Sequence, residues 1–240
     1  MINRKKLTGF QLILAMTFIV LLSIYIYGEI DKIGSDPAWD GPNVAGAGNI
    51  EAELGKLYWP PKIGKGYPTD IDFYDQSGKN VRISDFRGKA LFIEYVGMNC
   101  PACQAYSGGN KRNIGAYGNN EVAQGVLTID EIFDQGYAGG IKLSDPRLVY
   151  IAILLYDMNM GQPTKEDARK WAAHFKLDKY KQKYVLAPAR DMRSQASYNL
   201  IPGFQLVDKN LILRSDSTGH YPQEDLYGKL LPMIPKILEE

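Results

Sequence analysis

Apolar residues fall into short runs along most of the chain, and glycine, proline and charged residues separate these runs. The two clearest strand candidates are Ala90–Val96 and Leu148–Leu155, which are apolar at almost every position, as strands buried on both faces are. Shorter apolar runs bounded by turn residues predict five further strands. They are expected at residues 71–74, 81–83, 184–187, 203–207 and 211–214, the last two forming a hairpin around residues 208–210.

Helical patterning is clearest between Thr164 and Phe175. Trp171, Ala172 and Phe175 form an apolar stripe there, and Thr164 opens the segment as a capping residue. Shorter helical segments are expected at residues 129–134, 193–198 and 223–238, the last interrupted near its prolines. Helices that alternate with strands and end in a hairpin predict an α/β or α+β sandwich, with helices packed on a central sheet.

The N-terminus carries a long uncharged run at residues 7–27. At about 1.5 Å rise per residue, a helix of this length spans about 30 Å, enough to cross a bilayer. Basic residues at positions 4–6 and acidic residues at 29 and 31 predict a cytoplasmic N-terminus, with the remainder outside the membrane. The alternatives are a cleaved signal peptide, which lacks a small-residue cleavage site here, and a buried helix, which the flanking charges argue against.

Three regions follow from this pattern. Residues 1–28 are expected to form a single-pass signal-anchor, and residues 29–65, rich in Gly, Pro, Asp and Asn, a linker that holds the domain off the membrane. Residues 66–240 are expected to form one folded domain. The Trp59-Pro60-Pro61 segment is apolar enough to pack onto that domain, which makes the boundary near residue 65 a soft one.

The balance of charges and the number of cysteines limit the classes of function and fold that the chain can belong to. The 240 residues include 28 Lys and Arg against 27 Asp and Glu, a net charge of +1, which gives no indication of nucleic-acid binding. Two cysteines are too few for a disulfide-scaffolded fold, so a core of ordinary size has to hold the domain together.

Those two cysteines carry the candidate chemistry. Cys100 and Cys103 follow the buried run that begins at Ala90, and the chain between strand and cysteines breaks at Gly97. At the start of a helix, free N–H groups and the helix dipole would stabilise a thiolate at Cys100, and Cys103 one turn later could resolve a mixed disulfide. A static disulfide would close a loop too small to remove much unfolded-state entropy. A zinc site would need further ligands, and no histidine lies at a finger-like spacing.

Glu94 is a carboxylate within an otherwise apolar strand, where burying a charge is unfavourable. One interpretation is proton transfer to and from Cys103, with a pKa raised by desolvation. The other is a residue at the strand edge whose carboxylate reaches solvent, and the residues alone do not choose between them.

Four features, in order, resemble the thioredoxin superfamily, especially its membrane-anchored TlpA-like and ResA-like thiol–disulfide oxidoreductases. They are the Asp-Gln-Ser-Gly-Lys … Ile-Ser-Asp-Phe-Arg-Gly-Lys segment at residues 75–89, Glu94 six positions before the first cysteine, the CXXC motif Cys100-Pro101-Ala102-Cys103, and Ile201-Pro202 with the strand that follows it. The resemblance covers residues 66–240 and implies a thioredoxin-like fold, a central mixed sheet flanked by helices.

The resemblance also implies an activity and a site. It implies an enzyme that exchanges disulfides with cysteine-containing proteins outside the cytoplasmic membrane, together with a transmembrane electron donor or acceptor and no cofactor. A reductase of the cytochrome c maturation type is the expected direction, and an oxidant is the alternative that the sequence leaves open. Cys100 would be the nucleophile, Cys103 the resolving thiol and Glu94 the buried acid. Pro101 and a cis Ile201–Pro202 bond would face the client, with backbone groups of Ile201 pairing with an extended client segment.

Two departures from the family pattern bear on substrate choice. Asn99 stands where an aromatic residue commonly precedes the first cysteine, and the insert at residues 104–147 is longer than the minimal fold needs. A copper-binding module of the Sco type is the alternative on the same fold, although that family uses a CXXXC spacing and a histidine before the last hairpin. A thiol peroxidase would have threonine or serine where this chain has Gly97.

Overall fold

The structure is a computed structural model that describes residues 47–118 and 120–240, which belong to one compact unit. The predicted anchor and the first part of the predicted linker lie outside the described residues. Within the described ranges, none of the helices combines the length and the apolar character that crossing a membrane requires.

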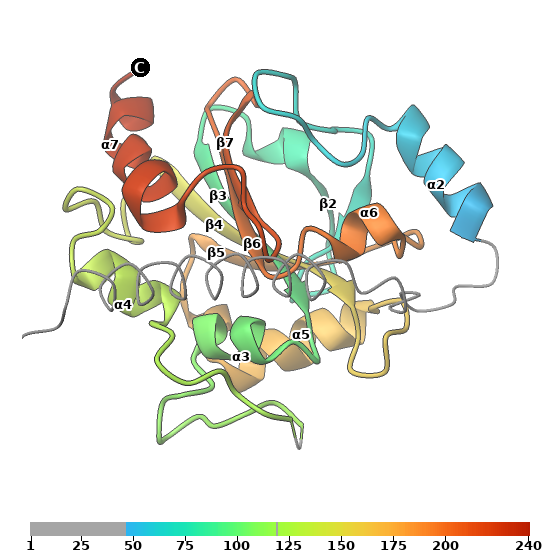
Figure 1. Ribbon diagram of the computed structural model, residues 1–240, viewed down its shortest axis with the longest axis horizontal. Coiled ribbons are helices and arrows are strands. Elements are labelled where there is room, and N and C mark those ends of the chain that lie inside the picture. Colours follow the sequence, from blue (N-terminus) through green and yellow to red (C-terminus); the bar gives the residue numbers. More distant parts are fainter. Residues whose placement is uncertain (1–46, 119) are drawn as a thin grey trace, which may run out of the picture. The chain divides into compact units, whose positions relative to one another are not determined.

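A seven-stranded mixed sheet forms the centre of this unit (Figure 1), with strand order β2-β1-β5-β4-β3-β6-β7. The central strands β3, β4 and β5 are parallel, whereas β6 and β7 on one side and β1 and β2 on the other pair antiparallel. The strand bounds are β1 Asp72–Tyr74, β2 Asn80–Arg82, β3 Ala90–Gly97, β4 Leu148–Tyr156, β5 Lys183–Pro188, β6 Gly203–Val207 and β7 Leu213–Thr218.

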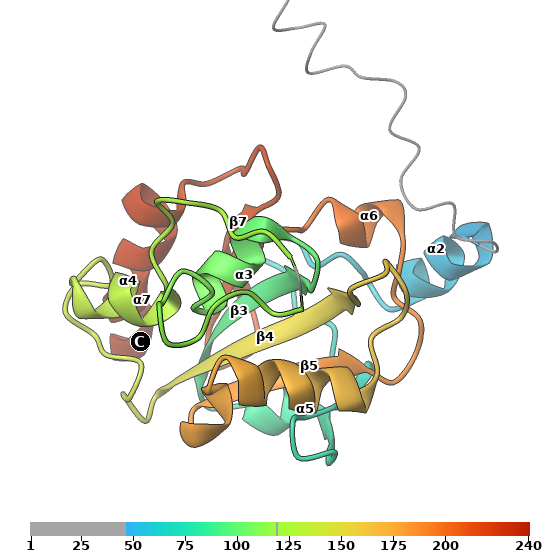
Figure 2. The same ribbon diagram turned by 90° about the horizontal axis from the view of Figure 1, so that it is seen from below.

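Helices and turns connect and cover these strands. The α-helices are α2 Ala47–Lys56, α3 Pro101–Ser107, α4 Ile129–Asp134, α5 Lys165–His174, α6 Gln195–Tyr198 and α7 Leu231–Glu239. Shorter turns are the 3-10 segments η1 Ile83–Phe86 and η2 Leu177–Lys179 and the π-helical segment η3 Leu226–Leu230. In Figure 2, α3 lies alongside β3, and α5 packs against β5.

The two longest strands form the buried centre, as their sequence predicts. Every residue of β3 and of β4 is buried, because helices cover both faces of the sheet at that point. Aromatic rings fill the layer under α3 and α4: Phe92 of β3 stacks on Phe204 of β6, and Phe133 and Tyr106 contact these two rings edge-on. Strand pairing and helical cover together confirm the predicted thioredoxin-like α/β class, with a mixed sheet flanked by helices.

Strand register decides which loops meet at the functional end of the sheet. In the β3–β6 pair, Glu94 lies opposite Phe204 and Tyr95 opposite Gly203. The pair therefore ends with the last residue of β3 next to the segment that leads into β6. An added Cβ at Gly97 would lie 3.3 Å from the Asn99 side chain and 3.5 Å from the Ile201 side chain, so the end of β3 is closely packed against both.

Several predicted boundaries shift by a few residues, two of them for a clear local reason. The second hairpin strand begins at Leu213 because Asp208 accepts hydrogen bonds from the N–H groups of Asn210 and Ile212, which lengthens the turn. The last helix is expected from residue 223, but helical structure begins only at Leu226, where the Asp225 side chain accepts from Gly228 N at 2.5 Å.

The described part of the predicted linker packs onto the domain. It contains α2, and Leu54 and Trp59 belong to the hydrophobic core. The Trp59 ring meets Tyr95 of β3 edge-on at 5.6 Å, and its indole N–H donates to the Ser197 hydroxyl of α6 at 2.9 Å. Contacts with the domain therefore begin before Gly66, at least from Leu54 onward.

Candidate functional site

Cys100 sits at the N-cap of α3, directly after the Gly97 break. Pro101 occupies the first helical turn, where its missing N–H leaves no intrahelical bond unmade. The Cys103 N–H points back to the Cys100 sulfur at 3.4 Å. Strand, break and helix therefore bring the CXXC motif to the helix N-terminus that the sequence predicts, with both cysteines as free thiols.

The two thiols differ strongly in their surroundings. Cys100 is partly exposed, whereas Cys103 is fully buried, and its sulfur contacts the Tyr95 carbonyl oxygen at 3.8 Å. Hydrogen bonding from Cys103 lowers the pKa of Cys100 to about 7, against the opposing effect of its partial burial, and backbone N–H groups of α3 add to the lowering. Burial raises the pKa of Cys103 well above its ordinary value, and the hydrogen bond to Cys100 and nearby negative charge raise it further. The pair thus consists of one partly exposed thiol that ionises near neutral pH and one buried thiol that stays protonated there.

Glu94 lies beneath this pair and is completely buried. One carboxyl oxygen accepts a hydrogen bond from the Tyr150 hydroxyl of β4, and the other, Oε1, has no hydrogen-bond partner among the described residues. Desolvation raises the pKa of Glu94 to about 8, partly offset by the Tyr150 hydrogen bond, while the Cys100 charge adds to the increase. A solvent-reaching carboxylate at a strand edge is therefore ruled out, and the environment is the desolvated one that a proton-transfer group needs.

The Ile201–Pro202 bond is cis, as the resemblance implies. Ile201 is buried, and its side chain lies against Gly97 at the end of β3. Its N–H donates to the Tyr198 carbonyl at 3.0 Å, so this backbone donor is already used within the protein. The Pro202 carbonyl accepts from Gly219 N at 2.9 Å, which ties the segment to the loop after β7. The structure thus brings this segment and the cysteine loop together.

The insert after α3 borders the cysteine loop. Gln104, the residue after Cys103, is fully buried, and its amide donates to the Met98 carbonyl at 2.7 Å and accepts from Tyr117 N at 2.7 Å. Asn120 donates to the Asn99 carbonyl at 2.6 Å, and Ala123 N donates to the Pro101 carbonyl at 3.0 Å. Backbone carbonyl groups on both sides of Cys100 are therefore held by residues of the insert.

Sequence reasoning missed several residues of this site. Tyr150 lies in a predicted buried strand, and nothing in that pattern indicates that its hydroxyl is the hydrogen-bond partner of Glu94. Burial raises the pKa of Tyr198, at the end of α6, and the residue lies close enough for the charges of the two cysteines to raise it further. A tyrosine in an apolar run carries no local signal for either role, because strand pairing and the α6 turn alone bring these residues to the site.

No metal site emerges from the described residues. Among them there is no group of three or more His, Cys, Asp and Glu side chains that could hold an ion. His174 is engaged elsewhere, since its ring nitrogen lies 3.0 Å from the Gly115 carbonyl oxygen.

Comparison with known proteins yields structural likeness only. No family model matches the chain, and no curated protein matches it. Similar solved structures include the thioredoxin domain of a thiol-disulfide oxidoreductase from Bacteroides vulgatus, at 16% identity and a TM-score of 0.44, with 72% of this chain and 98% of that chain covered.

Two Sco proteins are similar to about the same degree. BsSco, a member of the Sco family of cytochrome c oxidase assembly proteins, has 14% identity and a TM-score of 0.44, with 74% of this chain and 97% of that chain covered. Arabidopsis thaliana ScoI with copper bound has 12% identity and a TM-score of 0.41, with 73% and 99% covered. At these levels the likenesses do not distinguish between functions, and the fold assignment rests on the sheet topology.

Proposed function

We propose that this protein is a thiol–disulfide oxidoreductase in which Cys100 attacks the client and Cys103 resolves the mixed disulfide. The observation that carries the proposal is the asymmetry of the pair. Cys100 is partly exposed at a helix N-terminus with its pKa lowered to about 7, whereas Cys103 is buried with its pKa raised. A thiolate near neutral pH with a protonated thiol one turn away is the arrangement that two-step exchange requires.

In the reductive direction, the Cys100 thiolate attacks one sulfur of a client disulfide. A Cys100–client disulfide forms, the client S–S bond breaks, and the departing client sulfur takes up a proton. Glu94 in its ionised form then accepts the proton of Cys103. The Cys103 thiolate attacks the Cys100 sulfur, forms the Cys100–Cys103 disulfide and releases the second client sulfur. The client gains two electrons, and the enzyme is left oxidised by two electrons.

The client would be a protein disulfide rather than the disulfide of a small molecule. Ile201 and Pro202 border the cysteine loop, and Pro101 is exposed at the start of α3. Because the Ile201 N–H is already engaged with Tyr198, an extended client segment would contact this region through side chains and the remaining backbone groups.

The setting we propose is extracytoplasmic. The uncharged run at residues 7–27, with basic residues before it and acidic residues after it, supports a membrane anchor with the folded domain outside the cytoplasm. A reductase in that compartment would need electrons from a membrane partner, because oxidising surroundings do not regenerate its dithiol. Cysteine-containing clients such as an apocytochrome c fit this direction of exchange.

A redox titration of the full chain in detergent tests the proposal. A midpoint near about −270 mV or lower would support a reductase that depends on a transmembrane donor, whereas a value near about −120 mV would make the protein an oxidant. If no reversible Cys100–Cys103 disulfide forms at any redox potential of the buffer, the redox assignment is refuted. Copper titration of the reduced chain would then test the Sco-type alternative.

Trapping the mixed disulfide between Cys100 and its client identifies the client protein. Cys103→Ser is expected to accumulate mixed disulfides through Cys100, because the resolving thiol is missing. Cys100→Ser is the matched control and should trap nothing. A Cys103→Ser variant that captures no protein in cells would count against a protein-directed role.

A further inference from the structure

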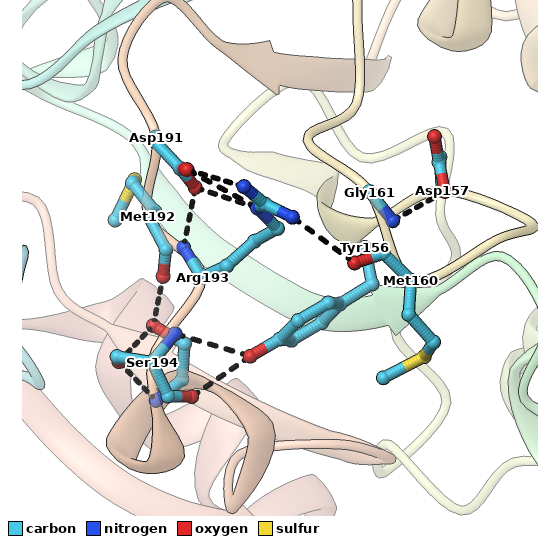
Figure 3. Close-up of polar contacts among 9 residues, drawn as sticks. Tyr156, Asp157, Met160, Gly161, Asp191, Met192, Arg193 and Ser194 are labelled. Carbon is cyan, nitrogen blue, oxygen red and sulfur yellow. Dashed lines mark hydrogen bonds and ion pairs between the residues drawn. The ribbon is translucent and has the colours of Figure 1, made fainter. Parts of the chain in front are cut away.

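Tyr156, the last residue of β4, is hydrogen-bonded to both loops that meet at the site, and Figure 3 shows its bonds to one of them, the segment before α6. Its backbone carbonyl accepts from the N–H of Met98, two residues before Cys100, at 2.9 Å. Its hydroxyl donates to the Ser194 carbonyl at 2.8 Å and accepts from the Ser194 N–H at 3.1 Å. Tyr156 and Ser194 are both buried, so these bonds do not compete with water.

Hydrogen bonds at the two ends of α6 connect Ser194 to the Ile201–Pro202 segment. The Ser194 hydroxyl caps this helix by accepting from Ser197 N at 3.0 Å. The helix ends at Tyr198, whose carbonyl accepts the N–H of Ile201. A single short helix, capped at one end by Ser194 and hydrogen-bonded at the other to Ile201, therefore separates the Tyr156 hydroxyl from the cis-proline segment.

Besides this first bridge, the hydrogen bonds from Tyr156 to Met98 and Ser194, a second and more exposed bridge joins the segment before α6 to the cysteine loop. Arg193 forms an ion pair with Asp191 at 2.7 Å and also donates to the Met160 carbonyl at 3.3 Å (Figure 3). The Met160 sulfur accepts from the side-chain amide of Asn99, the neighbour of Cys100, at 2.9 Å. Both bridges link the same segment before α6 to the same cysteine loop.

We infer that Tyr156 is a positioning residue for exchange with protein clients, because it fixes the cis-proline segment relative to Cys100. The inference rests on the proposed function. Exchange needs the attacking, central and leaving sulfurs in line, so a client held along Ile201–Pro202 reacts well only when that segment keeps its distance from the nucleophile. A small disulfide reaches Cys100 by diffusion and does not need the segment.

The test compares Tyr156→Phe with a matched control in the full chain. The variant keeps the ring and the backbone bond to Met98 but removes the hydroxyl. Tyr67→Phe removes another buried tyrosyl hydroxyl, which is hydrogen-bonded to Tyr95 of β3 at 2.6 Å instead of to the segment before α6. Insulin serves as the protein substrate and oxidised glutathione as the small disulfide, with circular dichroism used to choose a temperature at which all variants are folded.

For Tyr156→Phe, kcat/KM for insulin is expected to fall about tenfold, mainly through kcat, because a bound client that is no longer held in line with Cys100 reacts more slowly. The rate with oxidised glutathione should stay within about twofold of the parent rate, and Tyr67→Phe should leave both rates within about twofold. Arg193→Gln, which weakens the more exposed bridge, should lower the insulin rate in the same direction by a smaller factor and provides a second test if Tyr156→Phe does not fold.

The outcomes separate the two proposals. If the parent exchanges disulfides with neither substrate, the proposed function is wrong. If the parent reacts with both and the hydroxyl variant loses both rates equally, Tyr156 stabilises the structure and does not position the client. If the variant loses neither rate, the inference is also wrong.

Discussion

Replacing Glu94 with Gln gives the sharpest test of the buried acid. The substitution keeps the shape of the side chain and removes the only proton that it can exchange near neutral pH. In the parent, Glu94 is fully buried with a pKa of about 8, against 4.5 for an ordinary glutamate, because burial disfavours its charged form. The folded protein therefore holds a proton that the unfolded chain releases.

The size of the effect follows from that difference. Since the folded-state pKa is the higher one, the folded state binds more protons between pH 4.5 and about pH 8, and the free energy of unfolding falls as pH rises through this window. With 1.36 kcal/mol for each pH unit in the window, Glu94 lowers the stability by about 3.5 kcal/mol between about pH 5 and about pH 8. Glutamine has no such proton, so the variant should lack this slope.

Urea unfolding of parent and variant at the two pH values measures this directly. Other groups that titrate in the window, Cys100 among them, are present in both proteins and largely cancel in the difference. The stability of Glu94→Gln relative to the parent should therefore rise by about 3.5 kcal/mol between about pH 5 and about pH 8. A relative stability that stays constant with pH would show that Glu94 titrates as a solvated carboxylate, and its role in proton transfer would lose its physical basis.

The same variant should slow exchange at a defined step. Without an acceptor for the Cys103 proton, release of the reduced client should slow by about 100-fold, whereas binding should change little. Rapid-mixing kinetics separate formation of the mixed disulfide from its resolution, and equal resolution rates in parent and variant would refute the assignment.

Two further predictions follow from the same region. The rate of alkylation of Cys100 by iodoacetamide in the parent should rise with pH around a midpoint of about 7. The same measurement in Cys103→Ser shows how much of the lowering of the Cys100 pKa comes from the Cys103 hydrogen bond. A parent midpoint near 9 would mean that the helix N-terminus and Cys103 do not stabilise the thiolate. Gln104→Leu should destabilise the fold by about 3 kcal/mol in urea unfolding, because it leaves the Met98 carbonyl and the Tyr117 N–H without their partner. The control Gln195→Leu, on the exposed face of α6, should change the stability by less than about 0.5 kcal/mol.

Local patterning was sufficient to predict the central elements and the position of the cysteines. The apolar runs of β3 and β4 have one structural solution in an α/β domain, since a strand buried on both faces must lie at the centre of the sheet. Cys100 is placed by equally local features, the break at Gly97 and the proline that opens α3. The domain's contacts with the linker were less predictable, because a Gly-rich and Pro-rich segment gives no sign that Leu54 will be buried.

The surroundings of the site depend on contacts between residues far apart in the sequence. Tyr150 is 56 residues from Glu94, and only the parallel register of β3 and β4 brings the two side chains together. Tyr156 and Ser194 are 38 residues apart and meet because β4 ends where the segment before α6 passes. Sequence spacing carries no information about such pairs, and a single chain without the sheet register cannot predict them.

In the proposed mechanism, the charge on Cys100 would let one buried carboxyl serve both stages of exchange. In the resting reduced protein, burial raises the pKa of Glu94 to about 8 and the Cys100 charge adds to the increase, so at neutral pH most Glu94 side chains hold a proton. When Cys100 joins the client in a mixed disulfide, that negative charge disappears and the pKa of Glu94 falls. Glu94 then ionises more readily at the moment when Cys103 has to lose its proton. Attack by Cys100 thus prepares the base for resolution, and the coupling needs no movement of the backbone because it acts through charge alone.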